Sequence, residues 1–286
     1  WSNKDVTLNY GEVFFCPEFE IKVNFENRDY YVNVWQMNRN GQIIFGLESS
    51  EVFGILYVED RKRRLIQEAV FARVVPEILY RINLKPDVLW LNESHTALTI
   101  PQILRDPFFA GTKTLFTIHT PEMAGMEKFY DHRIDSLDIA DKYKWAFSDN
   151  GVIDLTLAAM RLADTVNAVS REHGDITRSM FPDFASKITH VTNGTDHKFW
   201  KHPKLSDLLK NGEKVNSLSL MGFHNYARHE SLQFADSLNW QLNGVSIKLR
   251  SDRPTAWFVR RFAGYKNLYN FLVDILPAVC ADRGTT

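Results

Sequence analysis

Three basic residues near the end of the chain have the types and spacing of an anion site. Arg260 and Arg261 close a short apolar run, and Lys266 follows at the expected start of a helix. A planar guanidinium can bind two phosphate oxygens at once, while a lysine adds a compact positive charge. The N-terminus of a helix contributes partial positive charge as well. The pattern predicts a phosphate site, although basic residues on a solvated helix end would look the same.

Polar side chains also follow four earlier apolar runs. A parallel sheet brings the carboxyl ends of its strands to one edge, where open α/β sheets bind their ligands. The residues at these positions include His, Asn and Glu, and are not only turn formers. We therefore expect a polar cleft along this edge; the alternative is a row of turn residues that binds no ligand. The four groups are Asn92–His95, His119–Pro121, Ser170–His173 and Asn193–Asp196.

The elements that must position these residues begin with a small antiparallel meander. Polar and apolar residues alternate over Glu20–Glu26 and again over Tyr30–Gln36, with turn residues between the two stretches. A third strand is expected over Gln42–Leu47. This period of two is typical of a sheet with one buried face. After Asp60 the apolar residues recur at three- and four-residue steps, which predicts a helix as far as Leu79.

Short, continuously apolar runs then alternate with helical patterns. This alternation predicts an α/β protein with a Rossmann-like, doubly wound parallel sheet. The expected strands are Val88–Leu91, Thr114–Ile118, Thr165–Val169, Ile188–Val191 and Ala256–Val259. The expected helices are Thr96–Arg105, Val152–Ala163, Glu172–Met180, Ser231–Leu242 and one after Lys266.

The composition excludes several classes of protein. With 34 Lys+Arg against 35 Asp+Glu, the net charge of −1 gives no reason to expect nucleic acid or an anionic membrane as partner. Two cysteines cannot form a disulfide framework, and no apolar run is long enough for a membrane span. We expect a cytoplasmic chain without a metal site. The glycine pattern also rules out the dinucleotide and P-loop signatures.

Six segments resemble, in the same order, motifs of the α-glucan phosphorylases, which include the glycogen, starch and maltodextrin enzymes. They are spread from about Leu56 to Lys266. The resemblance implies a GT-B arrangement of two Rossmann-like domains, with an acceptor domain over residues 1–250 and a truncated catalytic domain over residues 251–286. The segments are the helix from Asp60 with Arg64, Gln67 and Glu68, then Leu91–Arg105, Thr117–Gly125, Val166–Arg178, His190–Gly194 and Phe258–Lys266.

The same resemblance assigns roles to individual residues. It implies that Arg261 and Lys266 bind the substrate phosphate and that His119 contacts the transferred sugar, so these three are the expected catalytic residues. Asn193 is implied to share the sugar's 6-hydroxyl with His119, and the pocket beside the anomeric carbon to contain Glu93 and His95. The full set of implied substrate-binding residues is Glu93, His95, Val169, Asn193, Arg260 and Tyr265.

The activity implied by the resemblance is the reversible phosphorolysis of α-1,4-glucan to glucose 1-phosphate. Its partners would be the glucan and phosphate, and a homo-oligomer would be in keeping with the family. The family uses pyridoxal phosphate on a lysine of a G-x-x-x-M-K-type segment, and this sequence contains no such segment. We therefore expect a partial chain that carries no pyridoxal phosphate and is inactive by itself.

Two other functions stay open. A GT-B glycogen or starch synthase, which uses a nucleotide sugar, also places R-x-x-x-x-K beside a diphosphate, and Arg261 and Lys266 fit that spacing equally well. The neighbouring V-S-R-x-H-G and H-V-T-N-G segments favour the phosphorylase. The other alternative is a catalytically silent module that binds glucan through its acceptor half.

Overall fold

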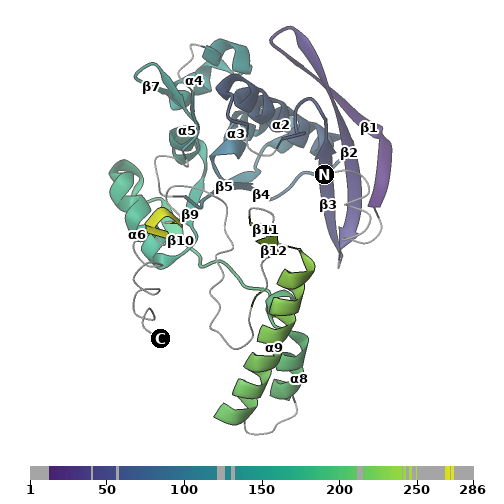
Figure 1. Cartoon of the computed structure of the whole chain (residues 1–286). Coiled ribbons are helices and arrows are strands. Elements are labelled where there is room, and N and C mark those ends of the chain that lie inside the picture. The colour runs from purple at the N-terminus through teal and green to yellow at the C-terminus, as the bar shows by residue number, and fades with distance from the viewer. Residues whose placement is uncertain are drawn as a thin grey trace. The chain divides into compact units, whose positions relative to one another are not determined.

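The computed structural model describes residues 13–39, 41–55, 58–120, 126–129, 133–210, 215–239, 241–242, 245–246, 249, 268–270 and 272–273. The chain divides into two compact units, Trp1–Gly194 and Thr195–Thr286, which are described separately. The domain boundary expected near residue 250 falls outside the described residues, so it stays a prediction. Figure 1 shows the elements of both units.

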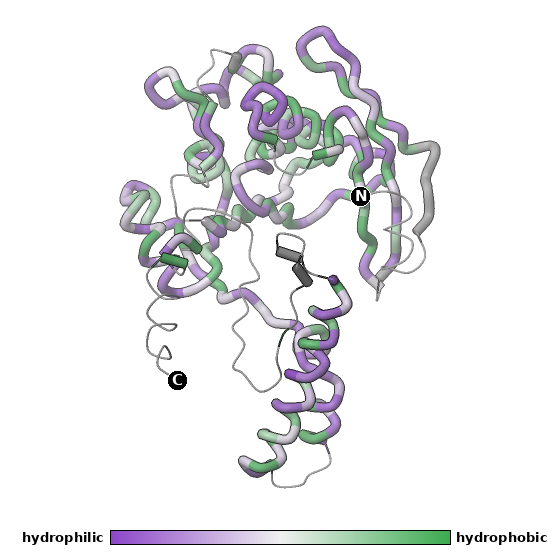
Figure 2. Tube along the Cα trace, viewed as in Figure 1, coloured by the Kyte–Doolittle hydropathy of each residue, from purple (hydrophilic) through white to green (hydrophobic). Residues whose placement is uncertain are grey.

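The N-terminal part of the first unit is the predicted antiparallel meander. Strands β1 (Val13–Phe25), β2 (Arg28–Arg39) and β3 (Gln42–Glu48) pair in sequence order. Alternate residues such as Ile21, Val23 and Phe25 are buried, and their neighbours face solvent. The tip between β1 and β2 is hydrophilic (Figure 2). The period-two pattern is thus confirmed, and its buried face packs against a helix.

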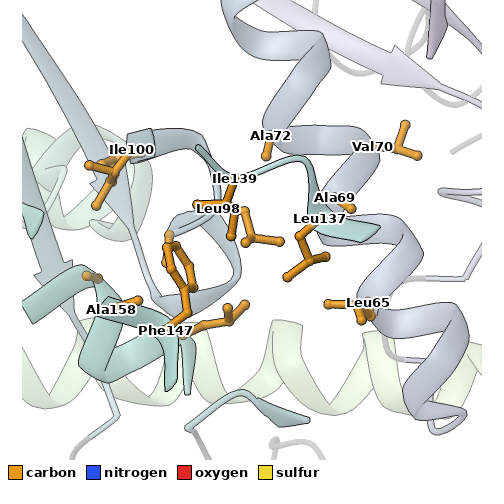
Figure 3. Close-up of a cluster of buried hydrophobic side chains, with 14 of the residues drawn as sticks. Leu65, Ala69, Val70, Ala72, Leu98, Ile100, Leu137, Ile139, Phe147 and Ala158 are labelled. Carbon is orange, nitrogen blue, oxygen red and sulfur yellow. The ribbon is translucent and has the colours of Figure 1, made fainter. Parts of the chain in front are cut away.

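That helix, α2 (Arg61–Arg81), begins where the sequence pattern predicted. The Asp60 side chain caps it by accepting a hydrogen bond of 2.8 Å from the Arg63 backbone N–H. Leu65, Ala69 and Ala72 of this helix point toward a buried group that includes Leu98, Leu137, Ile139 and Phe147, as Figure 3 shows, whereas Val70 points away from it. The helix therefore has apolar side chains on more than one side, and it joins the meander to the parallel sheet.

A four-stranded parallel sheet forms the centre of the first unit and confirms the predicted α/β fold. Its strand order is β10-β9-β5-β4, and every neighbouring pair is parallel. The four strands are β4 (Val88–Asn92), β5 (Lys113–Ile118), β9 (Thr165–Ala168) and β10 (Ile188–His190). The short helical segments between and after them are η1 (Ser94–Thr96), α3 (Thr99–Arg105), η2 (Pro107–Phe109), η4 (Arg133–Leu137), α4 (Asp141–Phe147), α5 (Leu155–Leu162), α6 (Arg171–Met180) and η5 (Pro182–Phe184).

The predicted helix Val152–Ala163 is wrong at its start. Val152–Asp154 form strand β8, which pairs antiparallel with β6 (Lys128–Phe129) and β7 (Ser148–Asp149). Helix α5 starts only at Leu155, because Asp154 is its N-cap and accepts the Leu157 N–H at 2.8 Å. Val152 and Ile153 are β-branched and favour a strand, but a run of three residues is too short for periodicity to separate a strand from the first turn of a helix.

Strand β4 also differs from its expected environment. Its continuous apolar sequence predicted burial on both faces, but Val88 is 55% and Trp90 64% exposed. The strand order explains this, because β4 lies at the edge of the parallel sheet.

The second unit contains two longer helices, α8 (Pro203–Lys210) and α9 (Ser217–Ser237). The predicted helix Ser231–Leu242 covers only the end of α9, which begins after an Asn216 capping box, and Gln241–Leu242 form strand β11 instead. The remaining described elements are α7 (His197–Trp200), β12 (Val245–Ser246) and α10 (Leu268–Asn270). The expected strand Ala256–Val259 lies outside the described residues. Within the described part, no helix combines the length and apolar composition that crossing a membrane requires.

Candidate functional site

Two neighbouring strands bring three polar residues together at the carboxyl edge of the parallel sheet. Asn92 ends β4, Glu93 follows it, and His119 comes directly after β5. The Asn92 Oδ1 atom lies 2.7 Å from His119 Nε2, and Glu93 Oε1 accepts the His119 backbone N–H at 2.5 Å. We call Asn92, Glu93 and His119 the edge cluster. Its geometry follows from the parallel pairing of β4 with β5, which places these strand ends side by side.

The backbone of Glu93 has an unusual conformation that aims its side chain at His119. Its φ of 69° is in the left-handed region, which costs a non-glycine residue on the order of 1 kcal/mol. Two hydrogen bonds hold it there: the Glu93 N–H donates to the Thr117 carbonyl at 2.9 Å, and the Thr96 hydroxyl donates to the Glu93 carbonyl at 2.7 Å. A strained residue held in this way is a common feature of ligand sites.

The contact with Asn92 determines which nitrogen of His119 is available. An amide oxygen only accepts hydrogen bonds, so His119 Nε2 carries the proton and donates it to Asn92 Oδ1. In the neutral ring, Nδ1 is then left as an acceptor. None of the described residues pairs with Nδ1, and the ring is half-buried, so this atom can accept a hydrogen bond from a ligand hydroxyl.

A second row of polar side chains lies on strands β4, β5 and β9, further from the carboxyl edge of the sheet. The buried Thr117 hydroxyl accepts hydrogen bonds from Trp90 Nε1 at 2.7 Å and from Asn167 Nδ2 at 3.3 Å. The Asn167 Oδ1 atom is buried and has no hydrogen-bond partner among the described residues. Asn167 was not among the predicted site residues; a buried amide inside an otherwise apolar strand was the available signal.

His173 is a further residue beside the edge cluster that the predicted set did not include. The Ser170 side chain caps α6 by accepting the His173 backbone N–H at 3.1 Å, which turns the imidazole inward. Burial lowers the pKa of His173, while the His119 backbone and the Glu93 carboxylate act in the opposite direction. Its Nε2 atom is buried and makes no hydrogen bond of good geometry within the described part. His173 thus lies close to both Glu93 and His119 as a buried imidazole.

His95 belongs to a different environment from Glu93, although the two are close in sequence. Burial lowers the pKa of the His95 imidazole most, and the charge of Arg64 lowers it further, while Glu127 opposes this change. The charges that act on His95 therefore come from α2 and from the segment before β6, not from the edge cluster.

The remaining predicted residues are only partly placed. The Asn193 backbone N–H donates to the Val169 carbonyl at 3.0 Å, which joins the ends of β9 and β10, and the Asn193 side chain is exposed. No described contact links either side chain to the edge cluster. Arg260, Arg261, Tyr265 and Lys266 lie outside the described residues, so the anion site at the end of the chain stays a prediction.

The described residues contain no cluster of side chains that would bind a metal ion. No three His, Cys, Asp or Glu side chains in that part of the chain gather as metal ligands would. A hollow of about 500 Å³ is lined by β1, the second half of α2 and the end of α3, and includes Arg73, Arg105 and Asp138. It shares no residue with the edge cluster.

Comparison with known proteins gives a family for this arrangement. The profile of starch synthase catalytic domains matches residues 4–186. A glycogen synthase from Clostridium kluyveri is 25% identical over 279 residues, covering 90% of this chain and 54% of that protein. A maltodextrin phosphorylase from Thermococcus litoralis is 23% identical over 316 residues, covering 89% of this chain and 38% of that protein. The chain spans about half the length of the curated glycogen synthase it matches.

A solved structure supports the same fold. The catalytic domain of Starch Synthase IV from Arabidopsis thaliana, bound to ADP and acarbose, superposes with a TM-score of 0.57 at 17% identity. The match covers 82% of this chain and 50% of that one. It confirms the GT-B glycosyltransferase-like fold.

These findings correct the predicted family. The assignment to the α-glucan phosphorylases is wrong. The matching profile is that of starch synthase catalytic domains, and glycogen synthases are among the most similar proteins. Three expectations that depended on this assignment are therefore wrong as well. They are phosphorolysis to glucose 1-phosphate, pyridoxal phosphate as the cofactor, and phosphate as the co-substrate. A phosphorylase also aligns over most of the chain, so resemblance to phosphorylase motifs does not separate the two families.

Proposed function

We propose, from the premise that this chain belongs to the family of starch synthase catalytic domains, that it forms the acceptor half of a glucosyltransferase. The enzyme would move a glucosyl unit from a nucleotide sugar to the non-reducing end of an α-1,4-glucan. The observation that carries this proposal is the edge cluster, where a carboxylate and an imidazole with an open acceptor atom meet at the carboxyl edge of the sheet.

The reaction requires little covalent chemistry from the protein. The bond between the sugar's C1 and the diphosphate oxygen breaks, and the nucleoside diphosphate keeps the electron pair. C1 then bonds to an acceptor hydroxyl oxygen, whose proton passes to the leaving diphosphate or to water. In this chain His119 Nδ1 would bind a sugar hydroxyl, and the Glu93 carboxylate would stabilise positive charge that develops near C1.

Two further observations support a nucleotide sugar as the donor. The similar Arabidopsis domain was solved with ADP and acarbose, a nucleotide and a sugar-like ligand. Arg261 and Lys266 have the R-x-x-x-x-K spacing that suits a diphosphate, as the second of the sequence hypotheses stated. In this proposal they bind the leaving group, and the glucan is the partner of the edge cluster.

A direct assay separates the possible reactions. The whole enzyme that contains this acceptor half is purified and incubated with maltoheptaose and either ADP-glucose or UDP-glucose, and the products are followed by mass spectrometry and by nucleotide release. We expect maltoheptaose to gain glucosyl units with equal release of nucleoside diphosphate. Release of glucose 1-phosphate from maltoheptaose and phosphate would overturn the proposal. Glucan binding without transfer from either donor would indicate the silent binding module instead.

A further inference from the structure

A buried group of charges lies between α2 and the segment that leads into β6. Glu127 is held on both carboxylate oxygens: Arg64 Nε donates to Oε1 at 3.0 Å, and Arg61 Nη1 donates to Oε2 at 2.9 Å. The Arg64 Nη2 atom also lies 3.0 Å from Oε1. Glu68, one turn further along α2, completes the group. We call Arg61, Arg64, Glu68 and Glu127 the inner cluster.

The inner cluster touches both chain segments that carry the edge cluster. Glu127 lies downstream of His119 on the segment that follows β5, and its backbone carbonyl accepts the Leu155 N–H at 3.0 Å. His95 follows Glu93 on the segment after β4, and the charges of Arg64 and Glu127 both act on its pKa. Arg64 is therefore placed between the continuation of the His119 strand and the continuation of the Glu93 strand.

Only one of the two glutamates is an effective partner for Arg64. Glu68 is 2% exposed, and neither of its oxygens makes a hydrogen bond of good geometry, although Arg64 Nε lies 2.9 Å from Oε1. Burial raises the pKa of Glu68 well above its ordinary value, and the nearby charge of Glu127 adds to this, against the opposing effect of Arg64 and Arg61. The shift favours the neutral acid at Glu68, and Glu127 is the glutamate that Arg64 binds through a hydrogen bond of good geometry.

We propose that Arg64, acting through Glu127, is a positioning residue for the edge cluster. This inference rests on the proposed glucosyl transfer. A guanidinium that binds a carboxylate through two N–H groups fixes direction as well as distance, and its strength grows where water is excluded. Helix α2 packs against η1, the turn that directly follows Glu93. Arg64 thereby fixes α2 against this turn, so that Glu93 keeps its position relative to His119. Displacement of such a group by about 1 Å can cost up to about 100-fold in rate.

The test compares the same chemical change at two sites of the inner cluster. Glu127→Gln removes the charge that binds Arg64, whereas Glu68→Gln changes a carboxyl group that accepts no hydrogen bond of good geometry. We expect Glu127→Gln to lower kcat/KM for maltoheptaose about tenfold, mainly through KM, and Glu68→Gln to change it by less than about twofold. Thermal unfolding of each variant shows whether the fold is kept.

A second pair addresses the arginine and covers the case in which Glu127→Gln does not fold. Arg64→Lys keeps the charge but loses the planar fork, and Arg63→Lys makes the same change at the neighbouring exposed position. We expect Arg64→Lys to raise KM for the glucan and Arg63→Lys to leave it unchanged.

Equal kinetic constants for both glutamine variants, or for both lysine variants, would overturn the inference, as would a loss of thermal stability with unchanged KM and kcat. A wild-type protein that transfers no glucose from either nucleotide sugar would instead overturn the proposed function itself.

Discussion

The edge cluster and the inner cluster both contain a glutamate carboxylate, but the hydrogen bonds of these carboxylates differ. In the inner cluster both oxygens of Glu127 accept hydrogen bonds from arginines, and the Glu68 side chain is buried. In the edge cluster the half-buried His119 leaves Nδ1 open, and each oxygen of Glu93 accepts one backbone N–H, from His119 at 2.5 Å and from Ser94 at 3.4 Å. Glu127 and its arginines satisfy one another, whereas His119 Nδ1 and the Glu93 oxygens can still accept hydrogen bonds from a ligand.

This difference shows that the interior charge pairs contribute to stability, while the residues at the sheet edge remain available to bind a ligand. Buried charges are costly unless they are paired, so Glu127 and the arginines of the inner cluster pair with one another. The carboxyl edge of the sheet faces solvent, where an unpaired acceptor costs little until a ligand replaces the water. Changes in the interior should therefore affect unfolding first, and changes at the edge should affect sugar binding first.

The largest effect is expected at Asp154, which anchors the segment next to the inner cluster. Its carboxylate is 3% exposed, caps α5 and lies 3.0 Å from Lys128 Nζ. Asp154→Ala removes a cap and leaves the lysine without this partner, so we expect a loss of about 3 kcal/mol in the free energy of unfolding, measured in urea. Asp175→Ala, which breaks an exposed pair with Arg178, should change little by comparison. Similar losses in both variants would contradict the assignment of Asp154 as an interior anchor.

At the edge, His119→Ala should reduce kcat/KM for maltoheptaose by roughly 10- to 100-fold, the value of one or two lost hydrogen bonds. The midpoint of thermal unfolding should stay close to that of the wild type, because the ring is only half-buried. His190→Ala, at the exposed end of β10, is the matched control and should keep its activity. A large fall in stability without a kinetic effect would place His119 with the interior residues instead.

Between the two clusters, Trp90→Phe tests the row behind the edge. The substitution keeps the aromatic ring but loses the indole N–H that donates to Thr117 at 2.7 Å. We expect a loss of about 1 kcal/mol in the free energy of unfolding, because the Thr117 hydroxyl keeps only the longer contact with Asn167. Trp145→Phe makes the same change at another exposed tryptophan, and its effect should be smaller. Equal effects would mean that the indole hydrogen bond adds nothing.

The smallest effect concerns the pH dependence of Glu68→Gln. The folded protein raises the pKa of Glu68, mainly through burial, so protonation favours the folded state. The stability that this group contributes is present below its ordinary pKa and is lost as the pH rises through the raised value. The free energy of unfolding of Glu68→Gln should therefore rise relative to wild type as the pH increases above 4.5, the ordinary pKa of this side chain. A constant difference across this range would show that Glu68 is ionised in the fold.

Residue patterns predicted the elements well where local periodicity decided them. The alternation in Glu20–Gln36 gave the meander, and the four apolar runs gave the parallel strands. Patterns were insufficient at Val152–Asp154, where pairing with distant strands outweighed helical spacing. They also did not show that β4 is an edge strand, since strand order depends on contacts far apart in the sequence.

The candidate site also has one part that the residue pattern predicted and another part that it did not. Strand ends in a parallel sheet meet at one edge, so the sequence predicted that Glu93 and His119 lie at the same edge, but their contact depends on the pairing of β4 with β5. It did not determine the reaction, because synthases and a phosphorylase both align with these segments.

Only the tertiary structure turned His173 toward the edge cluster, placed His95 near Arg64, and left Glu127 rather than Glu68 as the partner of that arginine. Those outcomes depend on burial and on charges that come from separate elements. Neither property can be read from the spacing of residues along the chain.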